Sequence, residues 1–215
     1  MIPASETRQN LLREAGKLLA EHGYQGTSLS MIAARLGLTK QALLHHFKSK
    51  PLLYGAVLAE LSEELLNVLF AAMDQGETPE HQLEVFFSAV AALGQENPDR
   101  LRLLMRALTE ADATEAARSN GGEGRSLQDV LEPLVALIQA TEAWEGSGAG
   151  TALGIASQLL GATCLFPAAA KILTAGFGTE VVDQAEQERC DLLHKLVHQV
   201  LTGMPPQELG ASPAG

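Results

Sequence analysis

Helical spacing of apolar residues runs through almost the whole chain and constrains its fold more than any other feature. Near the amino end, five apolar residues recur three and four positions apart, as on one face of an amphipathic helix: Leu11, Leu12, Ala15, Leu18 and Leu19. Runs of alternating apolar and polar residues between turn residues, which are typical of strands, do not occur. The sequence therefore predicts an all-α fold.

Glycine, proline and polar clusters divide this pattern into about nine helices. The first ends near Gly23. A long fourth helix begins at Ser49 and tolerates Pro51, because the first turn has no intrahelical N–H bonds to lose. The other expected helices cover residues 29–36, 40–46, 79–95, 98–117, 126–144, 149–174 and 179–202. Residues 203–215 contain three prolines and three glycines without periodicity, so we expect a disordered tail.

Charge is distributed unevenly along the 215 residues. The formal net charge is −11, yet residues 1–55 hold seven basic and three acidic residues, and the remainder holds eight basic and 23 acidic ones. A basic amino-terminal part on an acidic body is typical of a small DNA-contacting head attached to a regulatory body. An uneven distribution without functional meaning is the alternative.

Composition indicates where the protein works. No apolar run approaches the roughly 20 residues that span a bilayer, and no basic segment followed by an apolar one opens the chain. The two cysteines, Cys164 and Cys190, form no repeated ligand or disulfide framework. With 46% apolar and 19% charged residues, the chain is able to bury a core without disulfides or a structural metal. We expect a soluble, cytoplasmic protein with no membrane partner.

A short helix, a glycine turn and a second short, polar helix follow one another between residues 31 and 46. The first helix covers 31–36, the turn is Gly37-Leu38-Thr39, and the second helix covers 40–46. Thr27 or Ser28 would cap the first helix and Thr39 the second. This order is the helix-turn-helix arrangement, in which the later helix enters the major groove of DNA.

The surrounding segment, GYQGTSLSMIAARLGLTKQALLHHFKSKPLLY, resembles the DNA-binding head of the TetR family of bacterial transcription regulators. The similar positions are the aromatic residue after Gly23, Thr27-Ser28, Ile32-Ala33, Gly37, Thr39, Leu43, His46-Phe47 and Ser49-Lys50. The family most often has a glycine where this chain has Gln41, and a phosphate-contacting tyrosine where it has Leu44. The resemblance implies a dimeric, ligand-responsive regulator.

Helix ends and charge predict how the head would contact DNA. Thr27, Ser28 and Lys50 lie at helix starts, where free N–H groups attract phosphate. Lys40, Gln41 and His45 would reach base edges, and Lys48 the backbone. The full set of expected DNA-binding residues is Thr27, Ser28, Thr39, Lys40, Gln41, Leu44, His45, Lys48 and Lys50. Two alternatives are that His45 and His46 make no DNA contact and that Gln41 faces solvent or a phosphate.

Motifs for catalysis are missing, since the sequence has no nucleophile elbow, P-loop or His-Glu-x-x-His. Cys190, His194 and His198 recur every four residues, but the outer two lie about 12 Å apart along a helix, too far to share one zinc ion. We therefore expect no enzyme, no metal site and no cofactor, and we interpret these three residues as the edge of a packed helix.

Two sets of residues in the body predict dimerisation and effector binding. Small residues at steps of three and four on the helix 149–174, together with an apolar face on the last helix, predict a four-helix dimer interface. Its residues are Gly150, Gly154, Ser157, Gly161, Cys164, Leu192, Leu193, Leu196 and Val200. The bulky candidates for an effector pocket are Phe70, Met73, Phe86, Phe87, Met105, Leu108, Trp144, Gln158 and Phe166. Close packing within one subunit and ordinary core packing are the respective alternatives.

These observations predict three segments: a helix-turn-helix DNA-binding domain at 1–48, a ligand-binding and dimerisation domain at 49–202, and the tail at 203–215. The favoured function is a repressor that binds a palindromic operator in double-stranded DNA as a homodimer and is released by a small, apolar effector. A helical small-molecule-binding or adaptor protein without DNA binding is the alternative.

Overall fold

The computed structural model describes residues 4–110 and 124–203. Within these residues the chain forms nine α-helices and one 3-10 turn, and no strand. The all-α prediction is therefore confirmed. In chain order the elements are α1 (Ala4–Gly26), α2 (Leu29–Arg35), α3 (Lys40–Phe47), α4 (Lys50–Gln75), α5 (Pro79–Glu96), α6 (Pro98–Thr109), α8 (Leu127–Gln139), η1 (Glu142–Trp144), α9 (Ala149–Phe177) and α10 (Thr179–Thr202).

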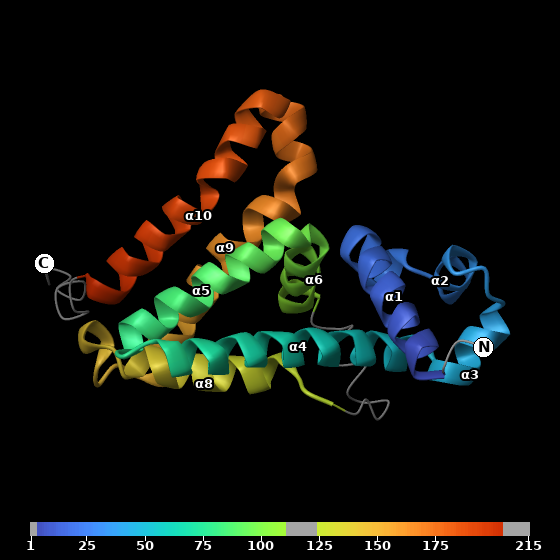
Figure 1. The fold of residues 1–215 in the computed structure, drawn as a ribbon, viewed down its shortest axis with the longest axis horizontal. Coiled ribbons are helices and arrows are strands. Elements are labelled where there is room, and N and C mark those ends of the chain that lie inside the picture. The colour runs from blue at the N-terminus through green and yellow to red at the C-terminus, as the bar shows by residue number, and fades with distance from the viewer. Residues whose placement is uncertain (1–3, 111–123, 204–215) are drawn as a thin grey trace, which may run out of the picture. The chain divides into compact units, whose positions relative to one another are not determined.

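Residues that lie close together in space group into two compact units, which we call the head unit and the body unit. The head unit comprises Met1–Glu64 and Glu96–Leu127, and the body unit comprises Leu65–Gln95 and Gln128–Gly215. The head unit is thus wider than residues 1–48, since it also contains the first part of α4 and the whole of α6. Within it α6 packs beside α1, and within the body unit α9 and α10 form a hairpin of two long helices (Figure 1).

The core of the head follows the spacing read from the sequence. Every apolar residue of the first helical stripe is buried, as are Ile32 and Ala33 of α2 and Leu43 and Phe47 of α3. Burial of these faces against one another removes apolar surface from water and fixes the three helices as one small bundle.

Local signals place most helix ends. Gly23 adopts φ 70° and ψ 178°, which turns the chain out of the regular path of α1 near its end. The Ser28 hydroxyl oxygen accepts a hydrogen bond from the Met31 N–H at 3.1 Å, so Ser28 is the cap of α2. Thr39 caps α3 in the same way, accepting from the Ala42 N–H at 3.2 Å.

Three of the later helices differ from the expected ranges by three residues or more. The helix expected over 126–144 stops at Gln139, because buried Thr141 takes an extended backbone and donates its hydroxyl to the Ile138 carbonyl before η1 begins. The helix expected over 98–117 ends at Thr109, and residues 111–117 lie outside the described part of the chain, as does nearly all of the expected tail. The helix expected to stop at residue 174 continues to Phe177.

The long helix α9 is apolar enough, by length and composition alone, to cross a membrane. This is weak evidence, because the core helix of a soluble protein passes the same test. One face of α9 is buried in the body unit, through residues that recur at helical spacing: Ala152, Ile155, Ala156, Leu159, Leu160, Thr163, Cys164 and Pro167. The apolar composition of α9 therefore partly reflects its place in a protein core.

Candidate nucleic-acid interface

The turn between α2 and α3 is closed by backbone hydrogen bonds. The Leu38 N–H donates to the Ala33 carbonyl at 2.8 Å, and the Gly37 N–H to the Ala34 carbonyl at 3.1 Å. Gly37 has φ 65°, a left-handed conformation that glycine adopts without steric cost. These bonds end α2 and fix the start of the turn that leads into α3, the order of a helix-turn-helix.

The outer face of α3 is polar and open to solvent. Thr39, Lys40, Gln41, His45 and Lys48 are all exposed. Leu43 and Phe47 of the same helix are buried instead. Leu44 and His46 of α3 are half-buried. Lys50, at the start of α4, is also half-buried. Basic groups and an amide on one exposed helix face are able to donate hydrogen bonds to both phosphates and base edges.

Thr27 requires a correction to the expected site. Its residue is 1% exposed, and its hydroxyl donates to the carbonyls of Leu18, at 3.1 Å, and Gly23, at 2.8 Å. The side chain is therefore engaged inside the head and is not available to a phosphate. The neighbouring Ser28 is exposed, and as the cap of α2 it lies beside the free N–H groups of that helix.

Lys48 has an unusual backbone conformation for a residue other than glycine. It is the one non-glycine residue with a positive φ, 56°, in the described part of the chain, and it ends α3 by donating its N–H to the Leu44 carbonyl at 2.8 Å. A lysine in this region costs conformational energy that a glycine would not. Its exposed ammonium group is consistent with a functional reason for the residue.

Lys50 is held by an aromatic residue that sequence reasoning did not single out for DNA binding. Its ammonium nitrogen lies 4.2 Å from the ring centroid of Tyr24, and the Tyr24 ring meets the Tyr54 ring edge-on at 5.0 Å. Partial burial lowers the pKa of Lys50 and raises the pKa of Tyr24. The signal for Tyr24 was the aromatic residue after Gly23 in the family pattern.

Arg8 is a further residue that the sequence analysis did not single out, and it is basic. Its guanidinium lies 5.3 Å from the ring centroid of Phe47 at the end of α3, and the residue is exposed. Together with the exposed basic residues of α3, Arg8 adds positive charge to the same bundle of helices.

Comparison with known proteins identifies this head. A family model described as bacterial regulatory proteins, tetR family, matches residues 11–57, which contain α2, α3 and their turn. This amino-terminal segment is therefore similar to the DNA-binding head of the TetR family. The match falls on the same segment in which the sequence predicts a helix-turn-helix.

Three transcription regulators match part of the chain by sequence. The HTH-type transcriptional regulator AcrR of Shigella flexneri is 41% identical over 66 residues, 31% of this chain and 30% of AcrR. The HTH-type transcriptional activator FasR of Mycolicibacterium smegmatis is 31% identical over 93 residues, 41% of this chain and 42% of FasR. The HTH-type transcriptional repressor AcnR of Corynebacterium diphtheriae is 32% identical over 65 residues, 30% of this chain and 34% of AcnR. The matched segments thus span less than half of each relative.

The similarity of fold extends over nearly the whole chain. A TetR-like transcriptional regulator from Rhodococcus sp. RHA1 superposes with a TM-score of 0.64 at 22% identity, covering 94% of this chain and all of that one. At this identity the likeness concerns the fold alone. The likeness of fold therefore includes the body unit as well as the head.

The body unit leaves apolar side chains of α9 and α10 open to solvent. Cβ atoms added at Gly150, Gly154 and Gly161 would meet no atom within 4 Å, so packing within the subunit does not explain these glycines. Leu192 and Leu196 are exposed at 56% and 41%. Further large apolar residues lie exposed on the same two helices: Leu153, Leu165, Ile172, Phe177 and Val181.

Not all of the expected dimer residues lie on open surface. Cys164 and Leu193 are buried within the subunit, because they share the inner faces of α9 and α10 with residues such as Leu160 and Val197. Burial raises the pKa of the Cys164 thiol to about 12. Val200 is half-buried, and its carbonyl accepts the Trp144 indole N–H at 2.8 Å, whereas Ser157 is exposed. The expected interface is therefore corrected by the removal of Cys164 and Leu193.

The expected effector residues do not form one group. Phe86 and Phe87 are fully buried, with their rings edge-on at 5.1 Å, and are core residues of the body unit. Met105 and Leu108 belong to the head unit. Of the remaining five, three are exposed and two are half-buried: Phe70, Met73 and Gln158, and Trp144 and Phe166.

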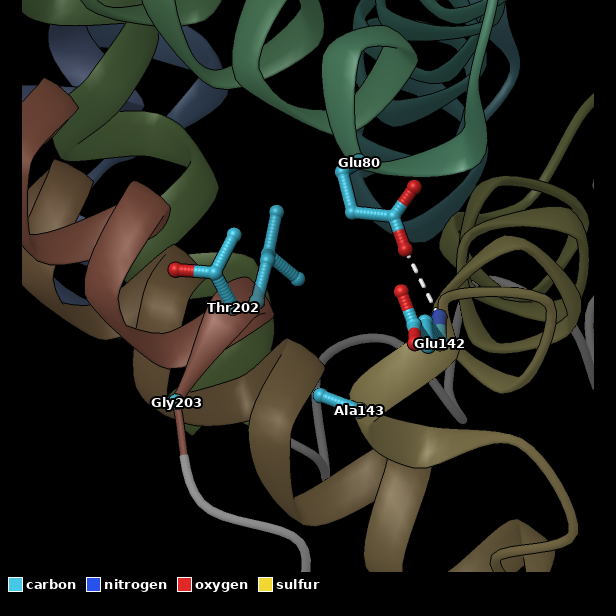
Figure 2. A pocket seen from close by; sticks show the side chains of 6 residues that line it. Glu80, Glu142, Ala143, Thr202 and Gly203 are labelled. Carbon is cyan, nitrogen blue, oxygen red and sulfur yellow. Dashed lines mark hydrogen bonds between the residues drawn. The ribbon is translucent and has the colours of Figure 1, made fainter.

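The body unit has a pocket of about 380 Å³ that none of these nine residues lines. Its walls are Glu80 at the start of α5, Glu142 and Ala143 of η1, and residues 201–203 at the end of α10. Figure 2 shows the Glu80 carboxylate directed at the backbone of Glu142, whose N–H donates to it at 2.7 Å. The two carboxylates make this pocket acidic, unlike the apolar effector site expected from the sequence.

Polar residues of α10 have partners on α5. The Nδ1 atom of His198 lies 2.7 Å from a carboxylate oxygen of Glu84, and Arg189, which is buried, donates to Glu186 and to the Ala91 carbonyl. Among the described residues no three His, Cys, Asp or Glu side chains gather as metal ligands. The contact of His198 with α5 agrees with our interpretation of it as the edge of a packed helix.

Proposed function

We propose that this TetR-family protein is a ligand-responsive repressor that binds a palindromic operator as a homodimer in the cytoplasm. The observation that carries the proposal is the polar face of α3, on which Lys40, Gln41 and His45 are exposed while Leu43 and Phe47 are buried. A helix held this way by a closed turn presents its side chains to the edges of bases in the major groove.

The contacts divide into two classes. Lys40, Gln41 and His45 read bases, and Gln41 in the first turn of α3 presents an amide that matches the donor and acceptor of adenine. Leu44 is unable to bond a phosphate, so backbone affinity comes from the capped start of α2 at Ser28, from Thr39, from Lys48 and from Lys50. The functional division remains 1–48 for DNA binding and 49–202 for ligand binding and dimerisation, followed by the tail.

Dimerisation through α9 and α10 is supported by their open apolar face. A soluble monomer seldom exposes this many large apolar side chains on two adjacent helices. Glycine inside a helix costs about 1 kcal/mol relative to alanine. Three glycines with open space above them on α9 therefore favour close approach of a second copy, in which two helices from each subunit form a four-helix interface.

We further propose a small, apolar effector in the body, as the sequence favours, bound elsewhere than in the acidic pocket beside Glu80 and Glu142. Repression is favoured by the relative AcnR, which is a repressor, while FasR is an activator and makes activation the competing mode of regulation. An effector that displaces the start of α4 would change the distance between the α3 helices of the two subunits. Operator half-sites lie about 34 to 36 Å apart, so the two α3 helices must keep that distance to bind both half-sites.

Binding to double-stranded DNA selected from a random library tests the proposal. Wild type should enrich a palindrome and bind it with an affinity that falls steeply with salt. Lys50→Ala should weaken all sequences alike and flatten the salt slope, whereas Gln41→Ala should lose about 1 to 3 kcal/mol of preference at one base pair in each half-site. Lys195→Ala on exposed α10 is the charge-matched control. Failure to enrich any sequence would favour a helical small-molecule-binding or adaptor protein.

A further inference from the structure

Arg106 of α6 and Glu110, the residue that caps the end of α6, are bonded through their side chains to the end of α1. Arg106 donates from Nε to the Ala20 carbonyl at 2.9 Å and from Nη2 to the Glu21 carbonyl at 3.0 Å. Its third nitrogen, Nη1, donates to Oε1 of Glu110 at 2.9 Å. The other oxygen of Glu110 accepts the backbone N–H of Tyr24 at 3.0 Å. We call these four hydrogen bonds the α6 clamp.

The clamp replaces a hydrogen bond that the helix itself would make. In an uninterrupted helix the Tyr24 N–H would donate to the Ala20 carbonyl, four residues earlier. The left-handed Gly23 breaks this path, and the clamp bonds both of the separated groups, the N–H through Glu110 and the carbonyl through Arg106. The corner between α1 and α2 therefore owes part of its hydrogen bonding to residues more than 80 positions away in the chain.

The same corner carries groups proposed to meet DNA. The Tyr24 ring supports the ammonium of Lys50 at 4.2 Å. The Gly23 carbonyl accepts the hydroxyl of Thr27, next to Ser28 at the start of α2. A displacement of Tyr24 or Gly23 would consequently move both the lysine and the capped helix end.

We propose that Arg106 and Glu110 are positioning residues for DNA binding, which hold Lys50 and the start of α2 in the geometry that an operator requires. The proposal rests on the proposed DNA-binding function. Neither residue lies on the helix-turn-helix itself, so neither needs to touch DNA. Only Asn97 separates α5 from α6 in the chain, so the clamp residues follow α5 closely in sequence and reach the corner through hydrogen bonds.

The test uses full-length protein and the operator that wild type selects from a random double-stranded library. Arg106→Gln and Glu110→Gln should each weaken binding by about three- to thirtyfold at constant salt. Arg102→Gln is the matched control, since Arg102 is on the same helix and pairs with Asp99 at 3.0 Å within it. It loses the same charge as Arg106→Gln and should bind within about twofold of wild type.

A second pair of measurements separates positioning from general stability. Exchange of the Tyr24 amide hydrogen should quicken in both clamp variants while amides of α3 stay protected. The charge exchange Arg106→Glu with Glu110→Arg should not restore binding, because a carboxylate at position 106 is unable to donate to the Ala20 and Glu21 carbonyls. Arg106→Lys, which keeps the charge but not the forked geometry, should recover only part of the lost affinity.

Three results would overturn the proposal. Clamp variants that bind the operator as tightly as wild type would show that the corner needs no support from α6. Restoration by the charge exchange would reduce the clamp to a simple ion pair. If wild type itself selects no DNA sequence, the proposed function fails and the positioning role fails with it, whereas unchanged variants beside a binding wild type refute the positioning role alone.

Discussion

Gly23 is the position where one added methyl group should disturb the head most. Its backbone, at φ 70° and ψ 178°, lies in a region that is essentially restricted to glycine. A Cβ atom there would come within 2.6 Å of Nη1 of Arg106 and within 2.6 Å of Oε1 of Glu110. Gly23→Ala thus perturbs the backbone and the α6 clamp at once.

The magnitude follows from the two effects. Forcing alanine into this region costs about 1 to 3 kcal/mol. The two clamp atoms are ends of flexible side chains and would move aside, which weakens hydrogen bonds worth about 1 kcal/mol each, an amount reduced because both side chains are about a third exposed. We expect the free energy of unfolding to fall by about 2 to 4 kcal/mol, or Tm by about 5 to 15 °C in a protein of this size.

The matched control is Gly16→Ala in the same helix. Its added Cβ would lie 3.6 Å from the nearest atom, Cγ1 of Val57, which is ordinary van der Waals contact. Because alanine favours helix over glycine, this variant should be as stable as wild type or about 1 kcal/mol more stable. Thermal and urea unfolding followed by circular dichroism compare the two. Equal stability of Gly23→Ala and Gly16→Ala would refute the reasoning.

The remaining predictions concern three other features of the chain. Thr27→Val should lower the free energy of unfolding by about 1 to 3 kcal/mol, because the Leu18 and Gly23 carbonyls lose the hydroxyl that donates to them inside the head. An unchanged urea midpoint would contradict this. Lys48→Gly should raise stability by about 1 kcal/mol, by relieving the positive φ, and yet weaken DNA binding measured by fluorescence anisotropy; unchanged binding would assign Lys48 no phosphate contact. Gly154→Leu with Gly161→Leu should give monomers by sedimentation, and a retained dimer mass would place the interface elsewhere.

Helix caps and helix interruptions, which depend on residues close together in the chain, were predictable from the sequence. Helix starts at Ser28 and Thr39, and the interruptions at Gly23 and Gly37, depend on hydrogen bonds and backbone angles within a few residues. The buried stripe of α1 follows from helical periodicity alone, so the helix-turn-helix head was predictable almost residue by residue.

Side chains whose environment comes from distant segments were not predictable. Thr27 and Ser28 are adjacent hydroxyl residues at a helix start, and only the packing of α1 turns Thr27 inward to the Leu18 carbonyl while Ser28 stays exposed. Cys164 continues the spacing of small residues on α9 but lies on the inner face. Steps of three and four average about 3.5 residues, whereas a helical turn has about 3.6, so the positions of such a series shift gradually around the helix.

The candidate effector residues and the α6 clamp have the same explanation. Phe86 and Phe70 are equally bulky and apolar, yet one is fully buried and the other is 50% exposed, because burial depends on which helices cover each face. Arg106 and Glu110 read in the sequence as an ordinary i, i+4 ion pair on a helix. Only the tertiary structure brings this pair to the backbone groups separated at Gly23, since a contact across 86 residues leaves no periodic trace in the chain.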